Sequence, residues 1–178
     1  MTEEIITTEI TAKQRLISNL TAAIGIILCG LFLLLCGVGA IGVDIVGAIA
    51  PAILIAFGAI LLINALVQTN TVSLYLSVLF FVCALTSCLA NFAGSLNYGK
   101  LYPFYIAAPA IASLFTMLMS RNFVSHTKVI VVFGVPSFFF FMLSFGVWAW
   151  YITLPAVLTY VGLLALYVAL SVRAKPEE

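Results

Sequence analysis

The sequence contains little charge. Of its 178 residues, seven are lysine or arginine and six are aspartate or glutamate, so that only 7% are charged while 65% are hydrophobic. An ordinary soluble domain has about 25% charged residues. This shortage of polar side chains excludes a water-soluble fold. The formal net charge of +1 also gives no support for a nucleic-acid partner.

Patterns that carry chemistry are also absent. The sequence has no nucleotide-binding fingerprint, no nucleophile elbow and no pair of acids in a candidate cleft. His126 is the single histidine, and the four cysteines, Cys29, Cys36, Cys83 and Cys88, contain no CxxC pair. A zinc site needs four soft ligands gathered together, whereas free cysteine packs as a small apolar residue. We therefore expect no enzymatic activity, no catalytic residue, no cofactor and no metal site.

Long apolar runs dominate the remainder. A helix of about 20 apolar residues crosses the hydrocarbon layer of a bilayer, and runs such as "LFLLL" and "SFFFFML" are apolar on every side, unlike the alternating strands of a barrel. The sequence therefore predicts an all-α, polytopic integral membrane protein with six transmembrane helices. The predicted spans are Ile17 to Ala40, Ile45 to Val67, Val72 to Ala93, Leu101 to Met119, Val129 to Trp148 and Ile152 to Val172.

The basic residues indicate the orientation in the membrane, because cytoplasmic loops hold most Lys and Arg. With six spans, Lys100 lies alone on one side. The other side receives Lys13, Arg15, Arg121, Lys128, Arg173 and Lys175. The distribution predicts that residues 1–15 and 173–178 are cytoplasmic tails on a membrane domain of residues 16–172.

A repeat of 52 residues runs through the membrane domain. Prolines stand at Pro51, Pro103 and Pro155, and a small residue follows seven positions after each of them. These small residues are Gly58, Ala110 and Gly162. Each copy includes a preceding apolar span and a short turn, so we expect three tandem helical hairpins, over about residues 16–68, 69–120 and 125–172.

The positions within the repeat suggest two structural roles. Each proline follows an outer turn, so we expect it in the first helical turn, where a missing N–H costs little. The small residue two turns later allows a neighbouring helix to approach closely, which drives helix association in lipid. Pro109 and Pro136 fall outside the repeat, and we expect them to kink the fourth and fifth spans.

A few polar residues lie within or beside the spans. Asn64 and Gln68 are one turn apart near the end of the second span, and Thr86, Ser87 and Asn91 lie in the third. Hydrogen bonds between helices explain both groups, and a polar lining for a small solute is the alternative. The two charges of the outer turns, Asp44 and Lys100, are interpreted as loop charges, with a pairing between hairpins as the alternative.

The repeated pattern resembles a known family. An apolar hairpin, an outer turn, an aromatic or small residue, proline, an aliphatic run and then a small residue resembles the transmembrane region of LiaI/LiaF-type bacterial envelope proteins, above all in "KLYPFYIAAPAIASLFTML". Tyr102 stands where that family commonly has tryptophan. The sequence ends in "SVRAKPEE" without the soluble domain of the LiaF type, which puts any sensing role of that domain in doubt. Three hairpins also look like the HdeD-type six-span proteins. Neither resemblance implies catalytic residues.

These observations favour one function over another. We expect a small, non-enzymatic, multi-pass protein of a bacterial inner membrane that contacts membrane partners through its helices, in the envelope stress response that the resemblance suggests. The four consecutive phenylalanines of the fifth span cover every side of a helix, so some of them must face lipid or a partner protein. A lipid-facing surface is the default, and a docking surface is the alternative. The alternative is an oligomeric unit for permeation of a small solute or ion. Expected partners are the lipid bilayer and another membrane protein or further copies of the chain, with no nucleic acid.

Overall fold

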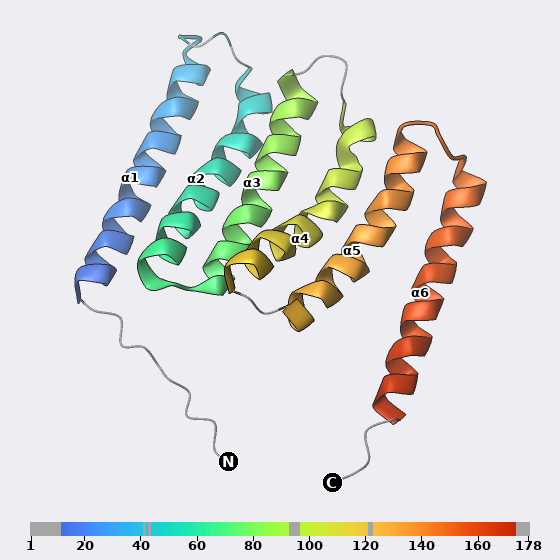
Figure 1. Ribbon diagram of the computed structural model, residues 1–178. Helices are drawn as coiled ribbons and strands as arrows, with labels where there is room; N and C mark the ends of the chain where they lie inside the picture. Colours follow the sequence, from blue (N-terminus) through green and yellow to red (C-terminus); the bar gives the residue numbers. More distant parts are fainter. Residues whose placement is uncertain (1–11, 41, 43, 93–96, 121–122, 174–178) are drawn as a thin grey trace, which may run out of the picture. The chain divides into compact units, whose positions relative to one another are not determined.

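The computed structural model describes residues 12–40, 42, 44–92, 97–120 and 123–173, and over these residues the chain forms six α-helices and no strand (Figure 1). The helices are α1 (Ala12–Gly37), α2 (Ile45–Gln68), α3 (Thr71–Phe92), α4 (Tyr98–Ser120), α5 (Phe123–Ser144) and α6 (Trp150–Arg173). Each contains an apolar segment of 19 to 25 residues, long enough to cross a membrane. The predicted all-α fold with six membrane-spanning helices is confirmed.

Residues with short polar side chains cap the N-termini of three helices. The Asp44 carboxylate accepts a hydrogen bond from the Gly47 N–H at 3.1 Å at the start of α2. The side chain of Asn70 accepts from the Val72 N–H at 2.9 Å before α3, and that of Asn97 accepts from the Lys100 N–H at 3.1 Å before α4. These caps satisfy N–H groups that have no partner within the helix. The predicted loop charge at Asp44 is therefore also a helix cap.

A residue in the left-handed backbone conformation follows the end of three helices. Gly39 follows α1, Thr69 follows α2 and Gly146 follows α5, with φ angles of 73°, 51° and 73°. A residue in this conformation turns the chain so that the last carbonyls of the helix find N–H donors. After α5, for example, the Gly146 N–H bonds to the Leu143 carbonyl at 3.0 Å. This turn ends the fifth helix at Ser144, four residues before the predicted end at Trp148.

The chain divides into two compact units, one up to Phe81 and one from Val82. In the first unit, α1 packs along α2, and α2 contacts the first part of α3 through Gly58 and Ser77. In the second unit, the remainder of α3 contacts α4, and α4 packs along α5 more extensively than α5 packs along α6. Helix α3 therefore contributes to both units.

Most of the buried positions are small or hydroxyl residues, whereas most of the large apolar side chains are exposed, with Leu101 as an exception. Fully or nearly buried residues include Ala48, Ala84, Ala108, Ala112, Ser77, Ser113, Thr116 and Thr153. The exposed residues include many leucines, isoleucines and phenylalanines, such as Leu28, Leu118 and Leu166. A soluble protein shows the reverse distribution. Because small residues let helices approach closely in lipid, this arrangement fits helices that expose their apolar surface to a bilayer.

Helix α4 bends about half-way along its length (Figure 1). Pro109 is the twelfth of its 23 residues. A proline inside a helix removes one main-chain hydrogen bond and its ring presses on the preceding turn, which bends the helix. The predicted kink in the fourth span is therefore seen in α4. Pro136 lies inside α5, as predicted.

Candidate functional site

The repeated prolines lie inside their helices rather than in the first turn. Pro51 is the seventh residue of α2, and Pro103 and Pro155 are the sixth residues of α4 and α6. The expectation of a first-turn position was wrong. Helix α2 begins at the predicted Ile45, six residues before its proline, while α4 and α6 begin three and two residues before the predicted Leu101 and Ile152. The caps at Asp44 and Asn97 lie six or seven residues before the prolines of α2 and α4.

In the first copy of the repeat, the small residue is covered by the following helix. Gly58 of α2 is buried, and a Cβ atom at this position would lie 3.3 Å from the ring of Phe81 on α3. The Ser77 hydroxyl of α3 also donates a hydrogen bond to the Gly58 carbonyl at 2.9 Å. Gly58 therefore lets α2 and α3 approach closely, which agrees with the predicted packing role.

In the second copy, the small residue is also covered. Ala110 of α4 is 7% exposed, and a Cβ atom at Gly134 of α5 would lie 3.8 Å from the Ala110 Cβ. Pro103, on the same side of α4, is buried as well. The first two copies thus share a geometry in which the face that carries the proline and the small residue packs against the next helix.

In the third copy, the same face is open. Pro155 and Gly162 of α6 are exposed, and no atom of the described residues lies within 4 Å of a Cβ built at Gly162. We use the name Gly162 face for the exposed side of α6 that helical spacing assembles around this glycine. It consists of Pro155, Leu158, Thr159, Gly162 and Leu166.

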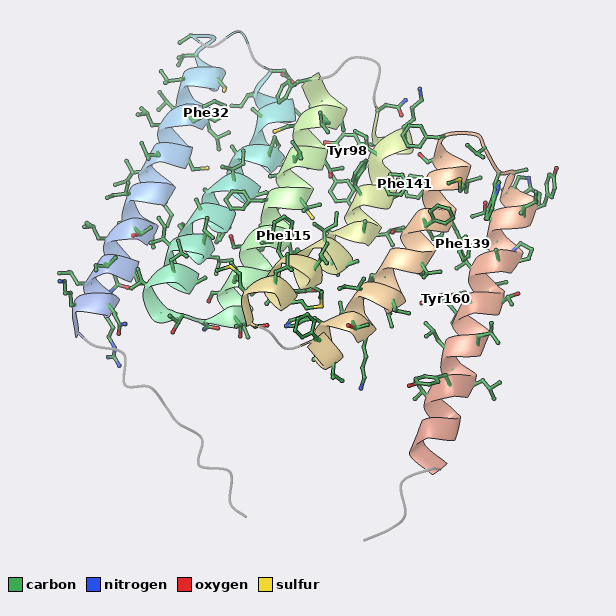
Figure 2. The ribbon with its side chains drawn as sticks, in the orientation of Figure 1. Phe32, Tyr98, Phe115, Phe139, Phe141 and Tyr160 are labelled. Atoms are coloured by element: carbon green, nitrogen blue, oxygen red, sulfur yellow. The ribbon has the colours of Figure 1, made fainter. Side chains whose placement is uncertain are left out.

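The other side of α6 contacts α5. The Tyr160 hydroxyl donates a hydrogen bond to the Val131 carbonyl at 2.5 Å, and the Tyr160 ring lies 6.5 Å from the Phe139 ring (Figure 2). Thr153 is 1% exposed on this side. Phe139 also stacks on Trp148, at 5.7 Å between ring centroids. Phe139 is therefore held within the second unit, and the Gly162 face points away from α5.

The polar residues predicted in the second span lie at the contact between α1 and α2. The Ser18 hydroxyl donates to the Asn64 side-chain oxygen at 2.5 Å, and the Gln14 side chain donates to the Val67 carbonyl at 3.1 Å. Asn64 therefore takes part in a hydrogen bond between helices. Gln68, one turn further, is partly buried at the end of α2.

The polar residues of the third span do not act as one group. The Thr86 hydroxyl donates to the Val82 carbonyl of its own helix at 2.8 Å, while the Ser87 and Tyr105 hydroxyls form a 2.8 Å hydrogen bond between α3 and α4. Asn91 is partly buried and also makes a polar or ring contact. Sequence reasoning did not identify Tyr105 as the partner of Ser87. The sequence signal for this pair was the presence of a polar side chain on each of the two neighbouring spans.

A buried hydroxyl on α4 was also missed by the sequence analysis. Ser113 is 0% exposed, and among the described residues its hydroxyl has no hydrogen-bond partner. Two other buried hydroxyls nearby are satisfied, since Thr116 donates to the Ala112 carbonyl and Ser137 donates to the Gly134 carbonyl, both at 2.8 Å.

Replacing Ser113 by alanine is expected to leave the protein as stable as before or to stabilise it, by up to about 1 kcal/mol. The reason is that a buried polar group without a partner costs about 1–3 kcal/mol. The free energy of unfolding can be measured by titrating the purified protein in mixed micelles with SDS. A loss of more than about 1 kcal/mol would contradict this expectation and would identify a bonded role for the hydroxyl.

The described helices therefore define a multi-pass helical membrane protein, with a buried interior of small and hydroxyl residues and an exposed apolar surface suited to lipid. Comparison of the chain with protein-family models, with curated proteins and with solved structures finds no match.

Proposed function

We propose that this is a non-enzymatic protein of a bacterial inner membrane that acts by contacting a transmembrane helix of another membrane protein through its Gly162 face. The observation that carries the proposal is the difference between the three copies of the repeat. Gly58 and Ala110 are covered by a neighbouring helix, whereas the face around Gly162 is exposed. A transmembrane helix is the kind of partner that such a face accepts in lipid.

The first copy indicates the chemistry of the partner. At Gly58, the neighbouring helix supplies an aromatic ring over the glycine and a hydroxyl that donates to its carbonyl. A partner helix on the Gly162 face would by analogy bring a large, rigid side chain above Gly162. Thr159, exposed on the same face, offers a hydroxyl for a hydrogen bond between the helices.

The cellular setting follows from the sequence. Six of the seven basic residues fall on one side of the six spans, which favours cytoplasmic tails at residues 1–15 and 173–178. The resemblance to LiaI/LiaF-type proteins suggests a role in the envelope stress response. The rival function, permeation of a small solute, has less support because Asn64 and Ser87 are engaged in hydrogen bonds between helices.

The experiment is photo-crosslinking in native membranes with a photoreactive residue at Leu158 or Leu166, which are 64% and 55% exposed on the Gly162 face. The expected result is capture of one particular membrane protein from both positions. Val168 is the matched control, because it is 56% exposed on α6 but lies on the other side of the helix. Capture from Val168 should be weak.

The variant Gly162→Leu should reduce this capture at least about fivefold, because a side chain at a helix crossing keeps the two backbones apart. The stability of the isolated protein should not change, since the space around Gly162 is open. Capture of lipid alone would contradict the proposed function. Capture of further copies of the chain would replace the heterologous partner by a homo-oligomer.

A further inference from the structure

The first turn of α4 contains a carbonyl that its own helix cannot satisfy. In an α-helix each N–H bonds to the carbonyl four residues earlier. Pro103 has no N–H, so the Gly99 carbonyl receives no such bond from position 103. Gly99 and Lys100 are exposed at the end of the span, so this carbonyl is open to a hydrogen bond from a side chain of a neighbouring helix.

The last residue of α5 supplies a donor at this point. The Ser144 hydroxyl lies 3.3 Å from the Gly99 carbonyl oxygen and 2.5 Å from that of Lys100. The two acceptors are neighbours in sequence. The short bond is to the Lys100 carbonyl, and the Gly99 carbonyl is the longer and weaker contact. A side chain of α5 thus stands where the main chain of α4 has lost a donor.

Two N–H groups of the same turn bond to Asn97. The Asn97 side chain accepts a hydrogen bond from the Lys100 N–H at 3.1 Å, and the Asn97 carbonyl accepts from the Leu101 N–H at the same distance. Leu101 is 2% exposed. The turn is therefore fixed by Asn97 at its N–H end and by Ser144 at its carbonyl end.

Two aromatic contacts between α4 and α5 lie next to this hydrogen bond. The Phe104 and Phe141 rings meet edge to face at 4.7 Å, and the Tyr102 and Phe140 rings meet at 5.9 Å. Phe141 is labelled between α4 and α5 in Figure 2. Ser144 is one turn beyond Phe141 on α5, so its hydrogen bond forms the end of a continuous contact.

We propose that Ser144 is a latch between the end of α5 and the start of α4. Its hydroxyl bonds to the Lys100 carbonyl and also contacts the Gly99 carbonyl, which Pro103 leaves without an N–H donor, so that the first turn of α4 is held helical from the neighbouring helix. A displacement of the end of α5 therefore opens this turn as far as Pro103, with no main-chain bond at that residue to resist it. The latch couples the position of α5 to the structure of the turn that carries Lys100.

The latch can be tested by hydrogen exchange, measured by mass spectrometry on the full-length protein in lipid nanodiscs. The readout is the exchange rate of the amides of Tyr102 and Phe104, which bond within the first turns of α4. In Ser144→Ala this rate should rise about two- to tenfold, the loss expected for one hydrogen bond. In Ser144→Thr, which keeps a hydroxyl, it should stay close to the original value.

A second variant isolates the role of the proline. Pro103→Ala restores an N–H that can bond to the Gly99 carbonyl, so adding Ser144→Ala to this variant should change the exchange rate less than half as much as in the original protein. Ser137→Ala is the matched control on α5. Its hydroxyl bonds to the Gly134 carbonyl of its own helix, and its loss should not affect α4.

The outcomes decide the proposal. An equal effect of Ser144→Ala with and without Pro103, or no effect at all, would overturn the latch. If Ser144→Ala alone does not fold, recovery of the folded protein in the double variant with Pro103→Ala would support it, and failure to recover would contradict it.

Discussion

Gly58→Leu is expected to destabilise the packing of α2 against α3 by about 3 kcal/mol. The first carbon of any side chain at this position would already lie 3.3 Å from the Phe81 ring, and leucine adds three more carbons. Separation of the helices would also lengthen the buried 2.9 Å hydrogen bond from Ser77 to the Gly58 carbonyl. The loss is measured as a lower midpoint concentration of SDS in an unfolding titration that is monitored by circular dichroism.

The matched control uses the same substitution in the third copy of the repeat. Gly162→Leu places leucine where no described atom outside its own stretch of helix lies within 4 Å, so the free energy of unfolding should stay within about 0.5 kcal/mol of the original. The two variants therefore separate a role in folding from a role in partner contact. An unchanged midpoint in Gly58→Leu would show that α2 and α3 do not pack as described.

The sequence predicts the helices well because the signal for a membrane span is continuous and local. Among the described residues, the first and last residues of α2 and α3 lie within one residue of the predicted spans. Helices α1 and α5 agree less well, since α1 begins five residues before the predicted Ile17 and α5 ends four residues before the predicted Trp148. At the end of α5 the apolar letters "FGVWAW" continue past the helix. A hydropathy pattern does not indicate that the chain turns at Gly146, which has a φ angle of 73°. Caps such as Asn97, which set where a helix begins, carry little weight in a hydropathy pattern.

The contacts between helices could not be predicted in the same way. The Ser87–Tyr105 and Ser144–Lys100 hydrogen bonds depend on the rotation of each helix about its axis and on its depth relative to its neighbour. With apolar residues on every side of a span, the sequence contains little information about that rotation. The repeat located the small residues at Gly58 and Ala110, but it did not indicate that Gly162 would be exposed.

Ala112→Leu and Leu118→Ala are expected to differ widely in their effect on the free energy of unfolding. Ala112 is 0% exposed on α4, with Ala108 at 1% and Thr116 at 1% on neighbouring turns, so leucine has no space there. The free energy of unfolding should fall by about 1–3 kcal/mol, the usual cost of overpacking. Large side chains are excluded from this interior because helix association in lipid depends on close contact between backbones.

Leu118 is the corresponding large residue on the outside, 66% exposed near the end of the same helix. Its truncation should change the free energy of unfolding by less than about 0.5 kcal/mol, because its side chain contacts lipid or detergent both before and after the helices separate. Both variants are measured by the same SDS titration. If Leu118→Ala were the more damaging of the two, the large apolar residues would have to be buried and the lipid-facing surface of α4 would be wrong. Together the two results would show that α4 packs through its small residues and exposes its large apolar residues, as expected for a helix surrounded by lipid.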